Sequence, residues 1–114
     1  MNAVHSAAAR AEDTDWRQIL ALYDLHLSIA PSPIVQLNRA VAVAEVEGPG
    51  VALALVDALD LGAQHRFHAI RADLLRRLDR LAEAAAAYDA AIALSANAAE
   101  RVFLEHMRAR LDDD

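Results

Sequence analysis

Residues 79–96 read Asp-Arg-Leu-Ala-Glu-Ala-Ala-Ala-Ala-Tyr-Asp-Ala-Ala-Ile-Ala-Leu-Ser-Ala. This stretch places Ala84, Tyr88 and Ala91 at spacings of four and three residues, so that they share one face of a helix. Small residues at the outer two positions let a neighbouring helix approach closely, and the ring between them fills the remaining gap. The stretch therefore predicts the second helix of an antiparallel helical hairpin.

The composition favours an all-α fold. Of the 114 residues 28 are alanine, and only 3 are glycine and 3 are proline, which is typical of stacked helices with thin interfaces. A chain of this length forms one domain with a modest core. We expect that domain at residues 13–111. Residues 1–12 are expected to form a helix that continues from an upstream region, and residues 112–114 a frayed acidic tail.

Start and stop signals divide the domain into helices. Thr14 or Asp15 suits the N-cap of a helix that runs to about residue 29. Pro31-Ser32-Pro33 ends that helix and starts another at Pro33, with Ser32 as its N-cap, which runs to about residue 46. Valines that alternate with alanines at residues 41–46 leave a β-strand as the competing interpretation.

The remaining signals predict a turn at residues 47–50, followed by helices at residues 51–59 and 63–78. Asp79 is the expected cap of the next helix. Asn97, with Glu100 three residues later, predicts a capping box. The final helix would then use Val102, Phe103, Met107 and Leu111 as its apolar face.

These hairpins recur at about the tetratricopeptide period. The copy around Tyr88 matches that pattern, although Asp79 stands where glycine is usual and Ala96 where proline is usual. An earlier copy at residues 37–59 fits with a two-residue insertion around Gly48 and Pro49. We expect a tetratricopeptide-like, right-handed stack of antiparallel helix hairpins with six to seven helices, which is typical of proteins that bind other proteins.

Charge and cysteine content exclude several classes of function. The net charge of −6 argues against a sequence-independent grip on nucleic acid, since that depends on neutralising phosphates. The absence of cysteine excludes disulfides and thiolate zinc sites. The sequence contains no export signal and no apolar stretch near 18 residues, so we expect a cytoplasmic protein that does not contact membranes.

An arginine-lined groove is the candidate binding site. In a helical-hairpin stack the first helix of each hairpin lines the concave face, and this register places five charged residues there, namely Arg39, Arg66, Asp73, Arg76 and Arg77. Arginine forks pair bidentately with carboxylates, so the groove suits an acidic partner segment. The alternative is a solvated face with local ion pairs, such as Asp73 with Arg76 or Arg77.

The sequence contains few residues in patterns that are typical of catalytic sites. His65 and His68 can share a helix face, but two histidines without a third ligand make a poor metal site. Nucleophile elbows, glycine-rich phosphate loops and paired carboxylates in a defined cleft are all missing from the sequence. We therefore expect no catalytic residues, no metal and no cofactor, and the chain is not predicted to be an enzyme.

Nearly all of residues 3–111 resembles the C-terminal extension of a group of bacterial extracytoplasmic-function sigma factors. The motifs that carry this resemblance are Asp15-Trp16, Leu22-Tyr23, Pro31-Ser32-Pro33, Leu37-Asn38-Arg39-Ala40-Val41-Ala42, Gly48-Pro49, Ala72-Asp73-Leu74-Leu75, Ala91, Glu100-Arg101 and Phe103-Leu104. The segment from Pro31-Ser32-Pro33 to Asn38-Arg39-Ala40 is the most specific of them.

The resemblance implies a tetratricopeptide-like module that regulates its sigma factor and hence transcription initiation. Its partners would be the sigma factor's own DNA-binding regions or core RNA polymerase, with no direct DNA binding by these 114 residues. The alternative is a free-standing tetratricopeptide-like scaffold that binds an acidic peptide or associates with itself as a homodimer.

Several residues of the family motifs are expected to be structural: Trp16, Tyr23, Pro31, Pro33, Asn38 and Tyr88. Trp16 and Tyr23 share a helix face and are predicted to be core residues; a stacking platform for a ligand is the alternative. Asn38 is interpreted as a buried amide that satisfies loop backbone, with a ligand contact as the alternative.

Overall fold

A computed structural model describes residues 15–112, and within this range the chain is helical and contains no strand. The helices are α2 (Trp16–Ile29), α3 (Pro33–Glu47), α4 (Pro49–Asp57), α5 (His65–Arg77), α6 (Leu81–Leu94) and α7 (Ala98–Leu111). The all-α prediction is confirmed for this range. The alternative of a strand at residues 34–46 is wrong, because α3 covers that segment. The expected helix at residues 1–12, Thr14 and the last two aspartates lie outside the described residues.

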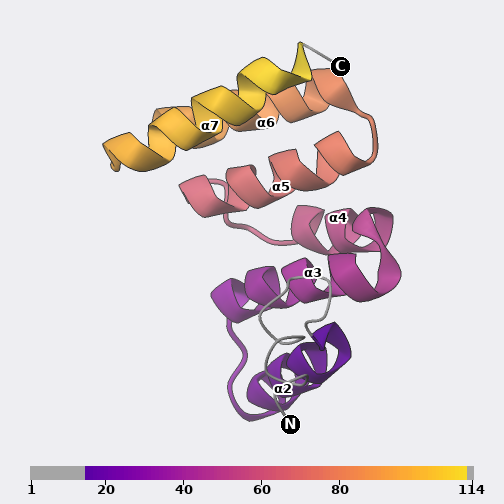
Figure 1. Ribbon diagram of the computed structural model, residues 1–114. Coiled ribbons are helices and arrows are strands. Elements are labelled where there is room, and N and C mark those ends of the chain that lie inside the picture. Colours follow the sequence, from indigo (N-terminus) through magenta and orange to yellow (C-terminus); the bar gives the residue numbers. More distant parts are fainter. Residues whose placement is uncertain (1–14, 113–114) are drawn as a thin grey trace, which may run out of the picture.

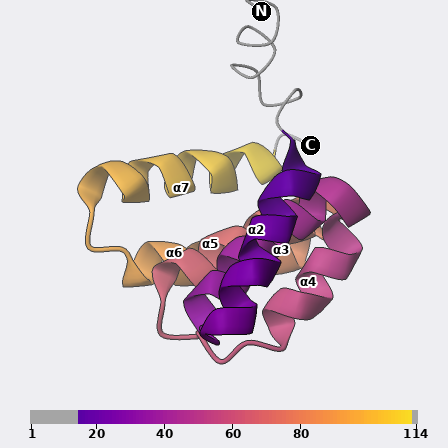
Figure 2. The ribbon, with the colours of Figure 1, turned by 90° about the horizontal axis from the view of Figure 1, so that it is seen from below.

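The helices form a stack in which each one packs on the next along the chain, from α2 at one end to α7 at the other (Figure 1). Their starts recur regularly. Helices α2, α4 and α6 begin at Trp16, Pro49 and Leu81, and helices α3, α5 and α7 begin at Pro33, His65 and Ala98. Equivalent helices are therefore offset by 32 or 33 residues. Figure 2 shows the same stack from below, with α2 nearest the viewer.

The predicted caps explain where the first two helices begin. The Gln18 amide donates to Asp15 Oδ1 over 3.1 Å at the start of α2. The Val35 amide donates to Ser32 Oγ over 3.3 Å, and Pro33 occupies the first position of α3. Proline is tolerated there because its missing N–H has no helical acceptor. Both caps are confirmed.

The connection between α3 and α4 is shorter than expected. Gly48 alone separates the two helices, with a φ of 98° that side chains rarely adopt. Pro49 and Gly50 belong to α4, which ends at Asp57. The predicted four-residue turn is wrong at three of its positions, because Glu47 ends α3 and Pro49 and Gly50 begin α4. Pro49 can start a helix as readily as Pro33 does.

Asp79 does not cap α6. It follows α5 with a φ of 61°, in the left-handed conformation that usually requires glycine. The Arg80 amide donates to Leu75 O over 2.9 Å and the Asp79 amide to Arg76 O over 3.0 Å, and these two bonds close the end of α5. Arg80 is the N-cap residue of α6 and makes no side-chain cap bond. Asp79 thus supplies the left-handed residue that ends α5.

The core lies where the sequence of residues 79–96 predicts it. Ala84, Tyr88 and Ala91 are buried, with Tyr88 only 2% exposed, and the α5–α6 interface is the most extensive in the stack. Helix α7 packs on α6 through Leu104 and Leu111. The predicted use of Val102 and Phe103 is wrong: they are 63% and 59% exposed, because the opposite side of α7 faces α6.

Candidate protein-interaction site

Helices α3 and α5 line a shallow hollow of about 120 Å³. Its walls come from Val41 and Ala44 of α3 and from Ile70, Asp73, Leu74 and Arg77 of α5. Two of the five predicted groove residues, Asp73 and Arg77, are therefore side by side at its edge. We call this hollow and the charged residues beside it the α3–α5 surface.

Ion pairs join the charged residues of this surface. Arg77 Nη1 lies 3.2 Å from Glu45 Oε2 on α3 and 3.9 Å from Asp73 Oδ2. Arg76 Nη2 lies 2.6 Å from Asp73 Oδ1. Asp73 thus sits between two arginines, and the local pairing weighed as the alternative is present.

Arg66 extends the surface toward the start of α5. Its Nη1 donates to Asn38 Oδ1 across the gap between α5 and α3. Asn38 is half-buried and bonds a side chain, so the expectation that its amide satisfies loop backbone is not met by this contact. Arg66, Asp73 and Arg77 all come from α5, which carries most of the charge of the surface.

Arg39 is separate from the other four predicted residues. It belongs to α3, but its Nε donates to Asp24 Oδ1 of α2 over 2.6 Å. It lines a different hollow, of about 390 Å³, between α2, α3 and α4. The sequence register predicts Arg39 on the same groove as Arg76 and Arg77. In the structure Arg39 and Arg77 line two different hollows, and Arg76 lines neither of them.

The Arg76 side chain connects the surface to the core. Its hydrogen bond to Asp73 raises the pKa of the guanidinium, although burial opposes this. Next to it, burial and the charge of Asp73 raise the pKa of the Tyr88 hydroxyl, and Arg76 partly offsets the rise. Arg76 Nε is buried and has no hydrogen-bond partner among residues 15–112. The same arginine therefore touches both the ion pairs and the buried ring.

These contacts are weak enough to exchange. The arginine and acidic side chains of the α3–α5 ion pairs are 30–44% exposed, and such pairs contribute roughly 0.2–1 kcal/mol each. Breaking one of these pairs therefore costs little, although the carboxylates of Asp73 and Glu45 would repel an incoming carboxylate.

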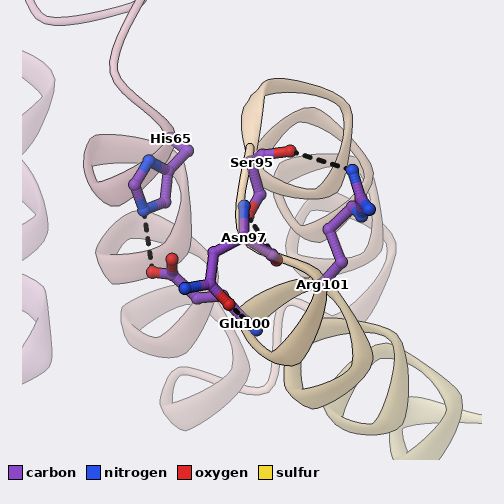
Figure 3. Close-up of polar contacts among 5 residues, drawn as sticks. All are labelled: His65, Ser95, Asn97, Glu100 and Arg101. Carbon is purple, nitrogen blue, oxygen red and sulfur yellow. Dashed lines mark hydrogen bonds and ion pairs between the residues drawn. The ribbon is translucent and has the colours of Figure 1, made fainter.

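The two histidines considered as metal ligands have other partners. His65 Nε2 lies 2.8 Å from Glu100 Oε1 of α7 (Figure 3), and His68 Nε2 lies 2.8 Å from the carbonyl oxygen of Gly62. Within the described range no group of three or more His, Cys, Asp or Glu side chains is placed to hold a metal ion.

Glu100 also shows that the predicted capping box is only half formed. The Glu100 amide donates to Asn97 Oδ1 over 3.0 Å, as predicted. The Glu100 carboxylate binds His65, and the Asn97 amide donates to Ser95 Oγ over 3.4 Å (Figure 3). Arg101 Nη1 donates to the carbonyl oxygen of Ser95 over 3.3 Å. The start of α7 is thus tied to both α5 and the end of α6.

The motif residues occupy different environments. Tyr88 is buried, as expected of a core residue, whereas Trp16 and Tyr23 are half-buried and α2 has no buried residue at all. Pro31 and Pro33 are exposed at the break between α2 and α3. None of the described helices is long and apolar enough to cross a membrane.

Sequence reasoning missed the ion pairs between neighbouring helices. These pairs are Arg39–Asp24, Arg71–Asp57, Arg77–Glu45 and Arg108–Asp89. Their members are between 14 and 32 residues apart, so no local spacing in the sequence points to them.

Comparison with known proteins gives one informative relative. The chain is 46% identical over 113 residues to an uncharacterized protein of Rhizobium meliloti (strain 1021), and the match covers 94% of the chain. It covers 27% of the relative, so the chain spans about a quarter of the relative's length. No family model matches the chain. No solved structure matches it either.

Proposed function

We propose that this chain is a regulatory protein-interaction module of an extracytoplasmic-function sigma factor. It would modulate transcription initiation through contacts to the sigma factor's DNA-binding regions or to core RNA polymerase, in the cytoplasm. The proposal rests on the resemblance of Pro31-Ser32-Pro33 and Asn38-Arg39-Ala40 to the C-terminal extension of these sigma factors. The two segments form the break between α2 and α3 and the first turns of α3.

The helix periodicity supports a tetratricopeptide-like stack. Equivalent helices are offset by 32 or 33 residues, close to the period of about 34 residues in that repeat. In this interpretation α3–α4 and α5–α6 are successive hairpins, and α7 follows as a further first helix. Side-by-side first helices of such repeats form an extended binding surface, and here that surface is formed by α3 and α5.

The length of the relative supports a module of a longer protein. A match that covers 27% of that protein leaves most of its length for other functions. The DNA-binding and polymerase-binding regions of the proposed sigma factor would belong to that remainder. With a net charge of −6, the chain itself is proposed to contact protein and not DNA.

The α3–α5 surface is the proposed docking site for an acidic segment of the partner. Arg66 and Arg77 bridge α3 and α5, and both are exposed enough to exchange their present acceptors. A partner carboxylate on Arg66 would replace the neutral Asn38 amide and so add an ion pair, and binding should therefore weaken as salt rises.

The test uses this chain and immobilised core RNA polymerase, and in parallel the upstream sigma regions. Arg66→Gln combined with Arg77→Gln should weaken binding at least tenfold at low salt and flatten its salt dependence. The matched control is Arg71→Gln combined with Arg108→Gln, which removes two interhelical ion pairs elsewhere. Equal binding by both double variants would exclude the α3–α5 surface, and no binding of the unmodified chain to either partner would exclude the proposal.

A free-standing scaffold that associates with itself is the second candidate, and one observation favours it. Leu22, Leu25 and Ile29 form an outward row on α2 and are 60%, 60% and 78% exposed. Exposed aliphatic rows of this kind occur at interfaces between proteins. Light scattering over a range of concentrations distinguishes the candidates, since a stable dimer whose mass drops in Leu25→Ser would favour the scaffold.

A further inference from the structure

The hollow between α2, α3 and α4 has mixed polar and aliphatic walls, and the Arg39 side chain is one of them. Its volume is about 390 Å³, within the range of roughly 300–1,000 Å³ typical of ligand pockets. Aliphatic side chains come from α2, from α4 and from the two residues just after α4, namely Leu27, Leu55, Ala58 and Leu59. Leu55 is 38% exposed, so its apolar surface is still available.

Three polar side chains line the same hollow: Asp24, Gln36 and Arg39. Arg39 uses only its Nε in hydrogen bonding to residues 15–112, and the acceptor is Asp24 Oδ1 at 2.6 Å. Its two terminal nitrogens remain donors for a ligand, and its side chain is 26% exposed. The Gln36 amide can both donate to and accept from a peptide group.

We infer that this hollow binds the carboxyl-terminal residue of a partner polypeptide that ends in leucine or a similar aliphatic residue. The aliphatic side chain would lie against Leu27, Leu55 and Leu59. The terminal carboxylate would pair with the free nitrogens of Arg39, and the preceding peptide group would bond to Gln36. The α3–α5 surface plays no part in this, so the inference does not depend on the proposed sigma-factor role.

Asp24 decides how strongly such a ligand is held. It lines the hollow and already accepts from Arg39, so its carboxylate repels an incoming carboxylate and competes for the same guanidinium. Removing its charge should therefore strengthen binding. A purely structural role of the Arg39–Asp24 pair predicts no such gain.

The test is a titration of this chain with N-acetyl-alanyl-leucine, followed by NMR of the leucine methyl groups. We expect shifts at Leu27, Leu55 and Leu59. The matching amide, N-acetyl-alanyl-leucinamide, should bind at least tenfold more weakly because it lacks the carboxylate. The simple acid 4-methylpentanoate, which lacks the peptide group, should bind severalfold more weakly than the dipeptide, and equal binding would assign the site to small aliphatic acids instead.

Variants complete the test. Arg39→Gln should weaken binding at least tenfold and Asp24→Asn should strengthen it severalfold. Arg108→Gln is the matched control, because Arg108 Nε makes an identical 2.6 Å contact with Asp89 at the other end of the stack. Equal affinity for acid and amide, shifts confined to other leucines, or no gain in Asp24→Asn would each overturn the inference.

Discussion

Helices α2 and α6 begin at equivalent points of the repeat but contribute very differently to the core. Tyr23 and Tyr88 are each the eighth residue of their helix. Tyr88 is 2% exposed between α5 and α7, whereas Tyr23 is only half-buried and α2 has no buried residue. The same aromatic at the same position therefore stabilises the stack only where a helix covers it on both sides.

Position in the stack therefore decides how much of each helix is buried. Interior helices α4 and α6 are each packed between two neighbours, whereas the one extensive contact of α2 within the described range is with α3. Three aliphatic side chains of α2 are exposed, namely Leu22, Leu25 and Ile29. A helix that carries apolar side chains on most of its faces is usually covered by other protein elements on most of those faces.

The largest expected effect comes from truncating the two tyrosines. Tyr88→Ala leaves a cavity against Ala84 and Ala91 and should lower the free energy of unfolding by about 3–5 kcal/mol. Tyr23→Ala removes a half-buried ring and should cost less than half as much. Urea unfolding followed by circular dichroism measures both. Equal losses would contradict the contrast between α2 and α6.

A smaller effect is expected at the turns inside the two hairpins. Asp79 adopts a φ of 61° in one hairpin and Gly48 a φ of 98° in the other. Asp79→Gly removes left-handed strain and should raise the stability by roughly 0.5–1 kcal/mol, while Gly48→Ala introduces strain and should lower it by roughly 1 kcal/mol. Thermal melts of both variants check the opposite signs; a melting temperature lowered by Asp79→Gly would show that the aspartate side chain is needed.

The smallest expected effect is the pH dependence of stability that comes from the Tyr88 hydroxyl. Burial raises the pKa of its hydroxyl in the folded state above the usual value of 10.0. The unfolded chain then loses its proton first, so stability is complete below pH 10 and falls as the pH rises through the folded-state pKa. Tyr88→Phe should show a smaller loss between pH 9 and pH 11. Identical pH profiles of the two proteins, measured by urea unfolding, would contradict the burial argument.

Local signals in the sequence were sufficient to predict most of the helices. Pro31-Ser32-Pro33 marks both the end of α2 and the start of α3, because proline acts on the backbone directly. The small-aromatic-small spacing around Tyr88 predicts the buried face of α6, since alanine there permits close approach. The recurrence of hairpins follows from these same features.

The predictions that were wrong concern features that depend on contacts between residues distant in the sequence. Val102 and Phe103 are apolar and correctly spaced, but the side of α7 that faces α6 carries Leu104 and Leu111 instead. Asp79 resembles a cap in sequence, yet the hydrogen bonds at the end of α5 place it in the left-handed conformation. Likewise the register of α3 does not reveal that Arg39 binds Asp24 of α2.

The most direct measurement is co-purification of core RNA polymerase with the full-length gene product that contains this chain, with and without residues 15–112. The regulatory-module proposal predicts that polymerase recovery, and transcription from the cognate promoter, change when the segment is removed. Unchanged recovery and unchanged transcription would contradict it.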